Sequence, residues 1–325
     1  MRPRVRFGSA PPVVVSLVLA AVAALAPATP AAATAPGRDG RIAYAGDDGT
    51  GHFQLFTVRP DGTGRRQLTH VSGDQNAVFP DWAPDGRRLA LTIQTGELSQ
   101  LYTIRADGTG LHKIFSDPRH SYDQPRWSPD GRRLAYTTTL PGGVCDINVT
   151  NGGANCAIGV MAADGTHRQV LRSSRLWNYF DPEWSPEGTR IAYDTNQGGL
   201  ISAIWVMNAN GTNPRRITPA KVIGTWPTWS PGGSEIAFTG GDDFGRPLYK
   251  VHPDGTGLRT ILPASQSPSH DFPSWSPAGD RIAYATFHAG NDCDLVTVRP
   301  DGSGVRTVFR AGCDFAFIDF GPAGS

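Results

Sequence analysis

The chain has 325 residues, with 30 Lys and Arg against 29 Asp and Glu and a formal net charge of +1. This near-neutral balance, without anything that resembles a basic stripe, argues against a nucleic acid as partner. The four cysteines are an even number, which is typical of disulfide pairing in an exported protein.

Residues 1–33 have the features of a secretory signal peptide. Three arginines are followed by an apolar stretch at 13–26 and by three consecutive alanines that form a small-residue cleavage site. This apolar stretch is shorter than the ~20 residues that span a bilayer. Cleavage would leave 27 basic and 29 acidic residues. We therefore expect Sec export, a linker at residues 34–39, and a secreted or periplasmic mature chain without a membrane span.

A phrase of proline, one residue, tryptophan, a tight turn and a short apolar strand recurs along the chain at intervals of about 45 residues, with one longer interval. A period of this size indicates a repeat architecture. The tryptophans of the five copies, and the aromatic residue of a degenerate sixth, are Trp82, Trp127, Trp184, Trp229, Trp275 and Phe320. Because packing alone places a large ring at the same position of every repeat, we interpret the tryptophans as core and not as sugar-stacking platforms.

A second phrase, Asp or Asn followed by Gly and by Thr or Ser, recurs six times, and each copy follows a strand-like run. Both of its first two residues tolerate the positive φ angles of tight hairpins. Each repeat thus contains two hairpins and four strands, which is typical of a propeller blade. In the third repeat we expect strands at 123–128, 133–138, 158–163 and 168–171.

The two ends of the repeat region complement each other. Residues 41–44 begin at a second strand with no tryptophan strand before them, and residues 315–320 form a first strand with nothing after it. The predicted fold is all-β: a monomeric six-bladed β-propeller of four-stranded antiparallel blades over residues 40–325. We expect the C-terminal strand A to pair with the N-terminal strand B and close the ring, which leaves no bare sheet edge.

Cys145 and Cys156 both lie in the insertion that lengthens the third repeat, and we predict a disulfide between them, worth ~2–3 kcal/mol. Cys293 lies between the second and third strands of the last blade, and Cys313 precedes the closing strand, so a second disulfide would clamp the closure. A tetrathiolate zinc site is the alternative, but no C-x-x-C pair is present and exported chains favour disulfides.

The phrase P-x-W-S-P-D-G-x-x-I/L-A-Y, followed by D-G-T-x-x-R-x-L-T, resembles the PD40 or WD40-like repeat of TolB-type β-propellers. Residues 66–69 and 215–218 match the tail of that repeat, and the resemblance covers nearly all of residues 40–322. It implies a six-bladed propeller. In TolB itself this propeller belongs to a periplasmic protein-binding scaffold of the Tol-Pal envelope system.

Two families of enzymes also resemble this chain. Prolyl-oligopeptidase-like peptidases carry a propeller beside a hydrolase domain, but no G-x-S-x-G nucleophile elbow is present here, which argues against a serine hydrolase. Oligogalacturonate lyases hold a metal through histidines and a glutamine at the mouth of the ring. The eight histidines of this chain are scattered, with no H-x-H or H-E-x-x-H pair.

The loops that lead into each first strand converge on one mouth of a propeller channel. Residues three to seven places before each tryptophan, or before Phe320, should therefore line this mouth, and they differ from blade to blade. The candidates are His120, Tyr122, Asp123, Gln124, Trp177, Asn178, Tyr179, Asp181, Trp226, His270, Asp271 and Asp314.

This mixture of aromatic rings, acids and amides suits an extracytoplasmic protein, peptide or glycan. The sequence thus favours a non-enzymatic binding scaffold without a cofactor. One alternative is that Trp226 and Phe272 only cap the core. Another is a metal-dependent polysaccharide lyase or hydrolase with its metal held by His120, Asp123, His270 and Asp271.

Overall fold

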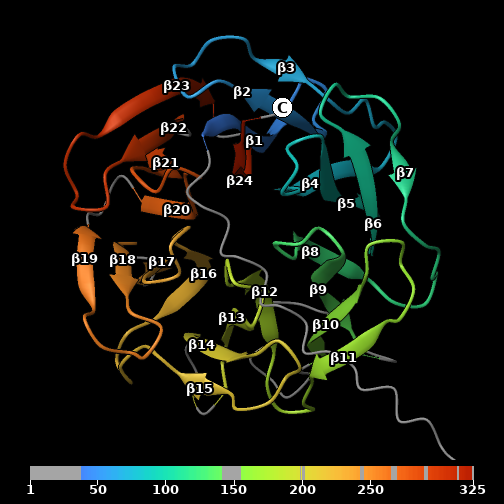
Figure 1. Ribbon diagram of the computed structural model, residues 1–325. Helices are drawn as coiled ribbons and strands as arrows, with labels where there is room; N and C mark the ends of the chain where they lie inside the picture. The colour runs from blue at the N-terminus through green and yellow to red at the C-terminus, as the bar shows by residue number, and fades with distance from the viewer. Residues whose placement is uncertain are drawn as a thin grey trace, which may run out of the picture. The chain divides into compact units, whose positions relative to one another are not determined.

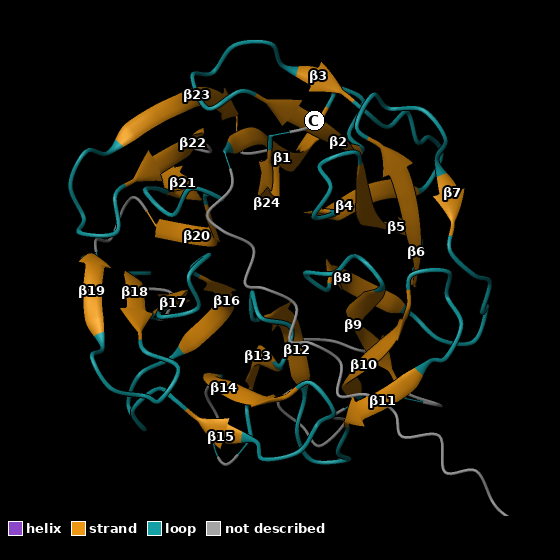
Figure 2. Ribbon diagram, viewed as in Figure 1, coloured by secondary structure: helices purple, strands orange, loops and turns teal. Residues whose placement is uncertain are grey.

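The computed structural model describes residues 38–140, 155–197, 199, 202–241, 245–264, 269–288, 292–312 and 315–323. All of them belong to the second of two units, residues 31–325, and each regular element among them is a β-strand (Figure 2). None of the described residues belongs to a helix with the length and hydropathy needed to cross a bilayer.

These residues form six antiparallel sheets of four strands, arranged as the blades of a ring (Figure 1). Blade 1 contains β24 (Phe315–Pro322), β1 (Asp39–Asp47), β2 (Phe53–Val58) and β3 (Arg66–Gln67). Blade 2 contains β4 (Gln75–Trp82), β5 (Arg88–Thr95), β6 (Leu98–Arg105) and β7 (His112–Lys113). Blade 3 contains β8 (Tyr122–Trp127), β9 (Arg133–Thr139), β10 (Cys156–Ala162) and β11 (Gln169–Arg172), each within two residues of its predicted bounds.

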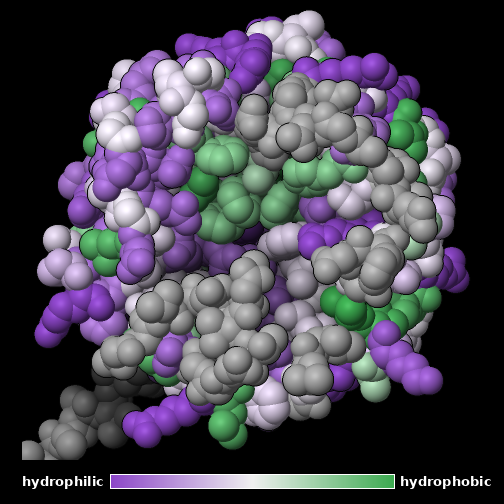
Figure 3. All heavy atoms as spheres, turned by 180° about the vertical axis from the view of Figure 1, so that it is seen from behind, coloured by the Kyte–Doolittle hydropathy of each residue, from purple (hydrophilic) through white to green (hydrophobic). Residues whose placement is uncertain are grey.

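The remaining blades repeat the same order from the inner strand outward. Blade 4 contains β12 (Tyr179–Trp184), β13 (Arg190–Thr195), β14 (Ala203–Asn208) and β15 (Arg215–Arg216). Blade 5 contains β16 (Gly224–Trp229), β17 (Ile236–Gly240), β18 (Leu248–Val251) and β19 (Arg259–Leu262). Blade 6 contains β20 (Ser269–Trp275), β21 (Ile282–His288), β22 (Asp292–Val298) and β23 (Arg306–Gly312). The six inner strands surround a central hollow, which is visible in the space-filling view (Figure 3).

The ring closes through strands from both ends of the propeller, as predicted. β24 pairs antiparallel with β1, so that Ile42 lies opposite Phe320 and Tyr44 opposite Ile318. The carboxylate of Asp39 also accepts a hydrogen bond of 3.0 Å from the backbone N–H of Ala278 in blade 6. Blade 1 is therefore tied to its neighbour as well as to the end of the chain.

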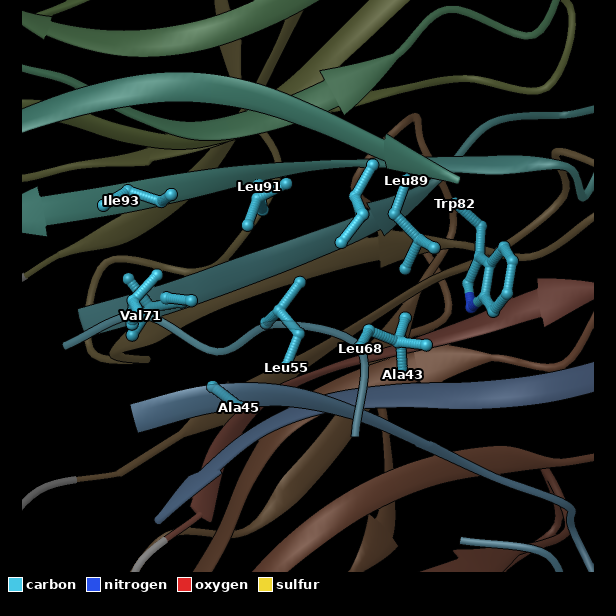
Figure 4. Close-up of a cluster of buried hydrophobic side chains, with 12 residues drawn as sticks. Ala43, Ala45, Leu55, Leu68, Val71, Trp82, Leu89, Leu91 and Ile93 are labelled. Carbon is cyan, nitrogen blue, oxygen red and sulfur yellow. The ribbon is translucent and has the colours of Figure 1, made fainter. Parts of the chain in front are cut away.

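Six clusters of buried apolar side chains fill the spaces between blades, and each draws on two neighbouring blades. Figure 4 shows the cluster between blades 1 and 2, where Trp82 and Leu89 pack against Ala43 and Leu68. The five repeated tryptophans belong to such clusters and are only 4–7% exposed. Their interpretation as core is therefore confirmed, and burial of each ring contributes ~2–3 kcal/mol.

The second repeated phrase forms the turns between the third and fourth strands. In the first copy, the carboxylate of Asp61 accepts hydrogen bonds from the N–H and the hydroxyl of Thr63, at 2.9 and 2.7 Å. Gly62 between them has a φ of 82°, and a Cβ there would lie 2.1 Å from the carbonyl oxygen of Val308. The turn therefore requires glycine both for its backbone angle and for the close approach of a neighbouring strand.

Two of the four cysteines lie among the described side chains. Cys156 and Cys293 are completely buried, and neither is a free thiol. Their predicted partners, Cys145 and Cys313, lie outside the described residues or side chains, so the two pairings stay predictions.

Candidate functional site

Each inner strand contains a β-bulge three residues before its tryptophan, or before Phe320 in β24. The residue there has a φ between 50° and 54° although it is not glycine, and the register of the strand shifts at the same place. Such a backbone costs about 1–3 kcal/mol per residue, so the surrounding structure must enforce it. The six bulge residues are Phe79, Gln124, Asp181, Trp226, Phe272 and Phe317.

Four of these bulge residues form a continuous row of rings, which we call the aromatic arc. Phe79, Phe317, Phe272 and Trp226 come from blades 2, 1, 6 and 5, and successive ring centroids lie 3.9, 4.8 and 4.3 Å apart. All four are half-buried and line the central cavity. Figure 3 shows the corresponding hollow, whose wall is hydrophobic over one part and hydrophilic over another.

The other two bulge residues, in blades 3 and 4, form a polar sector. The amide of Gln124 donates a short hydrogen bond to the Asp181 carboxylate, and its oxygen accepts one of 2.5 Å from the Thr137 hydroxyl. Burial raises the pKa of Asp181 to about 6, although a side-chain hydrogen bond with Asp194 opposes this rise. Burial, followed by the charge of Asp181, raises the pKa of Asp194 well above its usual range.

A second layer of side chains comes from the residue just before each tryptophan or Phe320. These residues are Asp81, Arg126, Glu183, Thr228, Ser274 and Asp319. The Nε of Arg126 lies 2.9 Å from the Glu183 carboxylate and 3.8 Å from that of Asp81. Burial raises the pKa of Glu183 to about 7 even though Arg126 opposes it. Burial raises the pKa of Asp81 well above its usual range, and Asp319 adds to this rise.

Two carboxylates of this layer also hold neighbouring blades together. Asp81 accepts a hydrogen bond of 2.6 Å from the backbone N–H of Trp127, and Asp319 accepts one of 2.7 Å from that of Trp82. A carboxylate that accepts a backbone N–H across a blade boundary fixes the spacing of the inner strands. These acids therefore have a structural role in addition to their charge.

The cavity between the two layers is small and opens between the inner strands. Its volume is about 30 Å³, which is room for about two water molecules. Its walls include the aromatic arc, Asp181, Arg126, Glu183 and Asp319. The cavity suits one polar or charged group that enters beside the apolar rings. It is too small for a whole drug-sized ligand.

Comparison with known proteins identifies the family. The TolB beta propeller domain model, PD40, matches residues 147–314, which is more than half of the chain. The chain belongs to the TolB β-propeller family.

The curated relatives of this TolB-like propeller share only part of their length with it. The Tol-Pal system protein TolB of Bordetella pertussis is 29% identical over 283 residues, covering 65% of this chain and 62% of the relative. Dipeptidyl-peptidase 5 of Porphyromonas endodontalis is 43% identical over 72 residues, 22% of this chain and 10% of the peptidase. The chain thus spans less than two thirds of either relative.

Among solved structures, TolB from Acinetobacter baumannii superimposes with a TM-score of 0.71 at 19% sequence identity. The match covers 87% of this chain and 67% of that one. At this identity the likeness concerns the fold alone.

The structure of this TolB-like propeller places two of the predicted mouth residues, Asp181 and Trp226, on the cavity wall. Gln124 bonds to Asp181 beside them. Phe272, which the sequence also suggested as a possible core cap, lies in the aromatic arc and packs partly against the cluster between blades 6 and 1. The bulge position is therefore what these four residues share.

The other residues predicted at the start of blade 3, from His120 to Asp123, do not line the cavity. His120 Nδ1 is 3.1 Å from the Asp117 carboxylate, which also accepts a 3.0 Å hydrogen bond from the Tyr122 hydroxyl. Burial raises the pKa of Asp123 to about 6, and the side chains of Ser99 and Thr92 in blade 2 oppose this rise. Asp123 therefore faces the neighbouring blade.

The predicted residues of blade 4 pack in its interior. Asn178 is 3% exposed, and its side-chain oxygen accepts hydrogen bonds of 3.0 and 3.1 Å from the backbone N–H groups of Asn155 and Cys156. Tyr179 is 2% exposed within the cluster between blades 3 and 4, and Trp177 packs half-buried against the same cluster. These side chains therefore support the loops of the mouth from within.

In blade 6, His270 is 7% exposed and packs edge-on against Tyr284 at 5.4 Å, and burial lowers its pKa. Asp271 forms an ion pair of 2.9 Å with Arg246. Asp314 lies outside the described residues. No group of three or more potential metal ligands occurs in the described part of the chain. The metal alternative for His120, Asp123, His270 and Asp271 stays a prediction.

Several channel residues were not among the candidates named from the sequence. They are Phe79, Arg126, Glu183, Phe317 and Asp319, and all of them line the cavity. Their signal is positional, because each lies one or three residues before a repeated aromatic residue. At these two positions the residue type changes from blade to blade while the aromatic residue is kept.

Proposed function

We propose that this TolB-like propeller is an extracytoplasmic, non-enzymatic scaffold that binds a protein, peptide or glycan at the mouth of its channel. The signal-peptide features of residues 1–33 support export, and relatives named Tol-Pal system protein TolB support a protein partner. The observation that carries the proposal is the aromatic arc, which presents four large, partly exposed apolar rings to the channel.

Half-exposed rings in a recess stabilise a complex when a partner covers them, by about 25 cal/mol for each Å² of apolar surface removed from water. Aromatic side chains are also enriched among the residues that contribute most to binding. Because the cavity is only about 30 Å³, the ligand would insert one side chain or one small group. The rest of the ligand would lie on the mouth.

The test is capture of a partner by the purified mature protein from extracytoplasmic extracts, together with a glycan array. We expect the double variant Trp226→Ala/Phe317→Ala to lose capture, since it removes two rings of the arc. The matched control is Leu111→Ala/Val305→Ala, which removes apolar side chains that are 42% and 54% exposed outside the channel. Thermal unfolding of all three proteins checks that the fold is retained.

Capture that is unchanged in the arc variant, or lost equally in the control, would contradict the proposal. So would a stoichiometric transition metal in the purified protein that disappears in His120→Ala/His270→Ala. That result, with cleavage of a polysaccharide, would establish the lyase or hydrolase alternative.

A further inference from the structure

The channel contains more carboxylates than cations. Among the described residues that line the cavity, Asp181, Glu183 and Asp319 face a single guanidinium, that of Arg126. Asp81 adds a fourth carboxylate at 3.8 Å from the same guanidinium. Buried charges in proteins are normally paired. Arg126 alone leaves this group of acids short of positive charge.

A fifth acid, behind the cavity wall, adds to the excess of carboxyl groups over cations. Asp194 is 2% exposed, and its Oδ1 has no hydrogen-bond partner among the described residues. The charge of Asp181, which lines the cavity, adds to burial in raising the pKa of Asp194, so the two carboxyls belong to one acidic group. Arg246, which lies over the Trp226 ring of the arc, is already paired with Asp271 at 2.9 Å. Burial raises the pKa of Asp181 and of Glu183, so protonation removes part of this negative charge. A cation brought by a ligand would hold the same carboxyls in their ionised form.

The aromatic arc, which lines the same cavity as the acids, fits the rest of such a ligand. The aromatic arc offers a row of half-exposed rings next to the acids, so a hydrocarbon stem can lie against it while a charged head reaches the carboxylates. Aromatic faces also attract cations. A cavity of about 30 Å³ accommodates a compact ammonium group better than a planar guanidinium.

We propose that the channel recognises a lysine side chain of a protein partner, with its ammonium group among Asp181, Glu183 and Asp319 and its stem along the aromatic arc. This inference rests on the proposed binding function and names the chemistry that the mouth selects. An arginine side chain carries the same charge on a larger guanidinium group, and its analogue is therefore compared with the lysine probe in the test.

The probe is Nα-acetyl-lysine N-methylamide, titrated into the purified mature protein and followed by calorimetry or NMR. We expect it to bind roughly tenfold or more tightly than the norleucine analogue, which has the stem without the charge. We also expect the lysine probe to bind more tightly than the arginine analogue. Glu183→Gln and, as a second variant, Asp181→Asn should each weaken lysine binding by a similar factor.

The matched control is Asp254→Asn, which removes one carboxylate charge from an exposed turn. Asn210 accepts the same pair of hydrogen bonds in the equivalent turn of blade 4, so the control should keep both its fold and its affinity for lysine. Equal binding of the lysine and norleucine probes, or unchanged binding in both acid variants, would overturn the inference. Binding of calcium chloride in place of the lysine probe would overturn it as well.

Partner capture separates this inference from the function on which it rests. Capture that is lost in Trp226→Ala/Phe317→Ala but unchanged in both Glu183→Gln and Asp181→Asn contradicts the lysine inference and leaves the binding function intact. Capture that survives in all of these variants contradicts the binding function itself.

Discussion

The spaces between the blades and the central channel are both lined by the same six inner strands, but their side chains differ in kind. Toward the neighbouring blade, five strands present tryptophan and the sixth Phe320, all nearly inaccessible. At the bulge position, which faces the channel, the strands present rings in blades 5, 6, 1 and 2 and polar groups in blades 3 and 4. Packing between sheets requires the same shape at each boundary, whereas the bulge position that faces the channel takes rings in some blades and polar groups in others. The properties particular to this chain are therefore expected in the channel.

The largest effect should come from two tryptophans on one strand, β16. Trp229 packs in the cluster between blades 4 and 5, and we expect Trp229→Ala to lower the free energy of unfolding by about 3–5 kcal/mol. Trp226 is half-buried in the channel, so Trp226→Ala should cost much less. Urea unfolding measures both, and equal losses would show that the channel ring is also core.

A smaller effect is expected from the cation of the channel. Arg126→Met leaves Asp81 and Glu183 without their partner and should destabilise the protein by about 3 kcal/mol at neutral pH. The loss should shrink in acid, because protonated carboxyls need no cation. Arg119→Met is the control, since its side chain is 83% exposed. Thermal unfolding across pH would contradict this prediction if the two variants behaved alike.

The pH dependence of stability sharpens the comparison further. Burial raises the pKa of Glu183 from 4.5 to about 7, so its contribution to the free energy of unfolding falls as pH rises through this interval. Glu183→Gln should therefore lose less stability than the wild type between pH ~5 and ~8.

Glu187, at the exposed end of the same blade, provides the opposite case. Burial acts to raise its pKa, but hydrogen bonds from Arg190 and the backbone hold it below 4.5 overall. Its contribution is present above its unfolded pKa and is lost as the pH falls through the folded pKa. Melting temperatures of Glu187→Gln should thus differ least from the wild type in acid, and the same trend in both variants would contradict the assignment.

The smallest effect is expected at the outer edge of the ring. Asp254→Asn should leave the free energy of unfolding nearly unchanged, because Asn210 forms the equivalent turn in blade 4. Chemical denaturation measures this. A large loss would mean that the charge of the turn, and not only its hydrogen bonds, supports the fold.

The architecture could be predicted because its determinants are local and repeated. Each Asp-Gly-Thr phrase forms its own turn, and each tryptophan fills an equivalent space. The strand at residues 315–320, which has no hairpin partner of its own, pairs with the strand at residues 41–44. Because six copies agree, the prediction of a propeller does not depend on the degenerate copies, such as the one that contains Phe320. The blade number and the closure followed from the same evidence.

The channel could be predicted only in part because of the bulges. In a regular strand, alternate residues face the same side, but a bulge changes which of two consecutive residues faces the channel. Asp123 and Gln124 were both expected at the mouth, but Asp123 lies against blade 2, while Gln124 belongs to the polar sector. Phe79 has a positive φ although a proline follows it. Nothing in the sequence indicated this, because residues before proline normally adopt extended conformations.

The pairing of β1 with β24 determines how the ring would respond to a pull. Asp39 lies opposite Pro322 and Gly46 opposite Phe315, so the two outward-leading ends of this strand pair lie at the same side. A force applied at these two ends would load one pair of backbone hydrogen bonds at a time, so that β1 and β24 would separate step by step. A propeller anchored through these two points would be mechanically soft, whereas one held through a turn within a blade would resist a much larger tension.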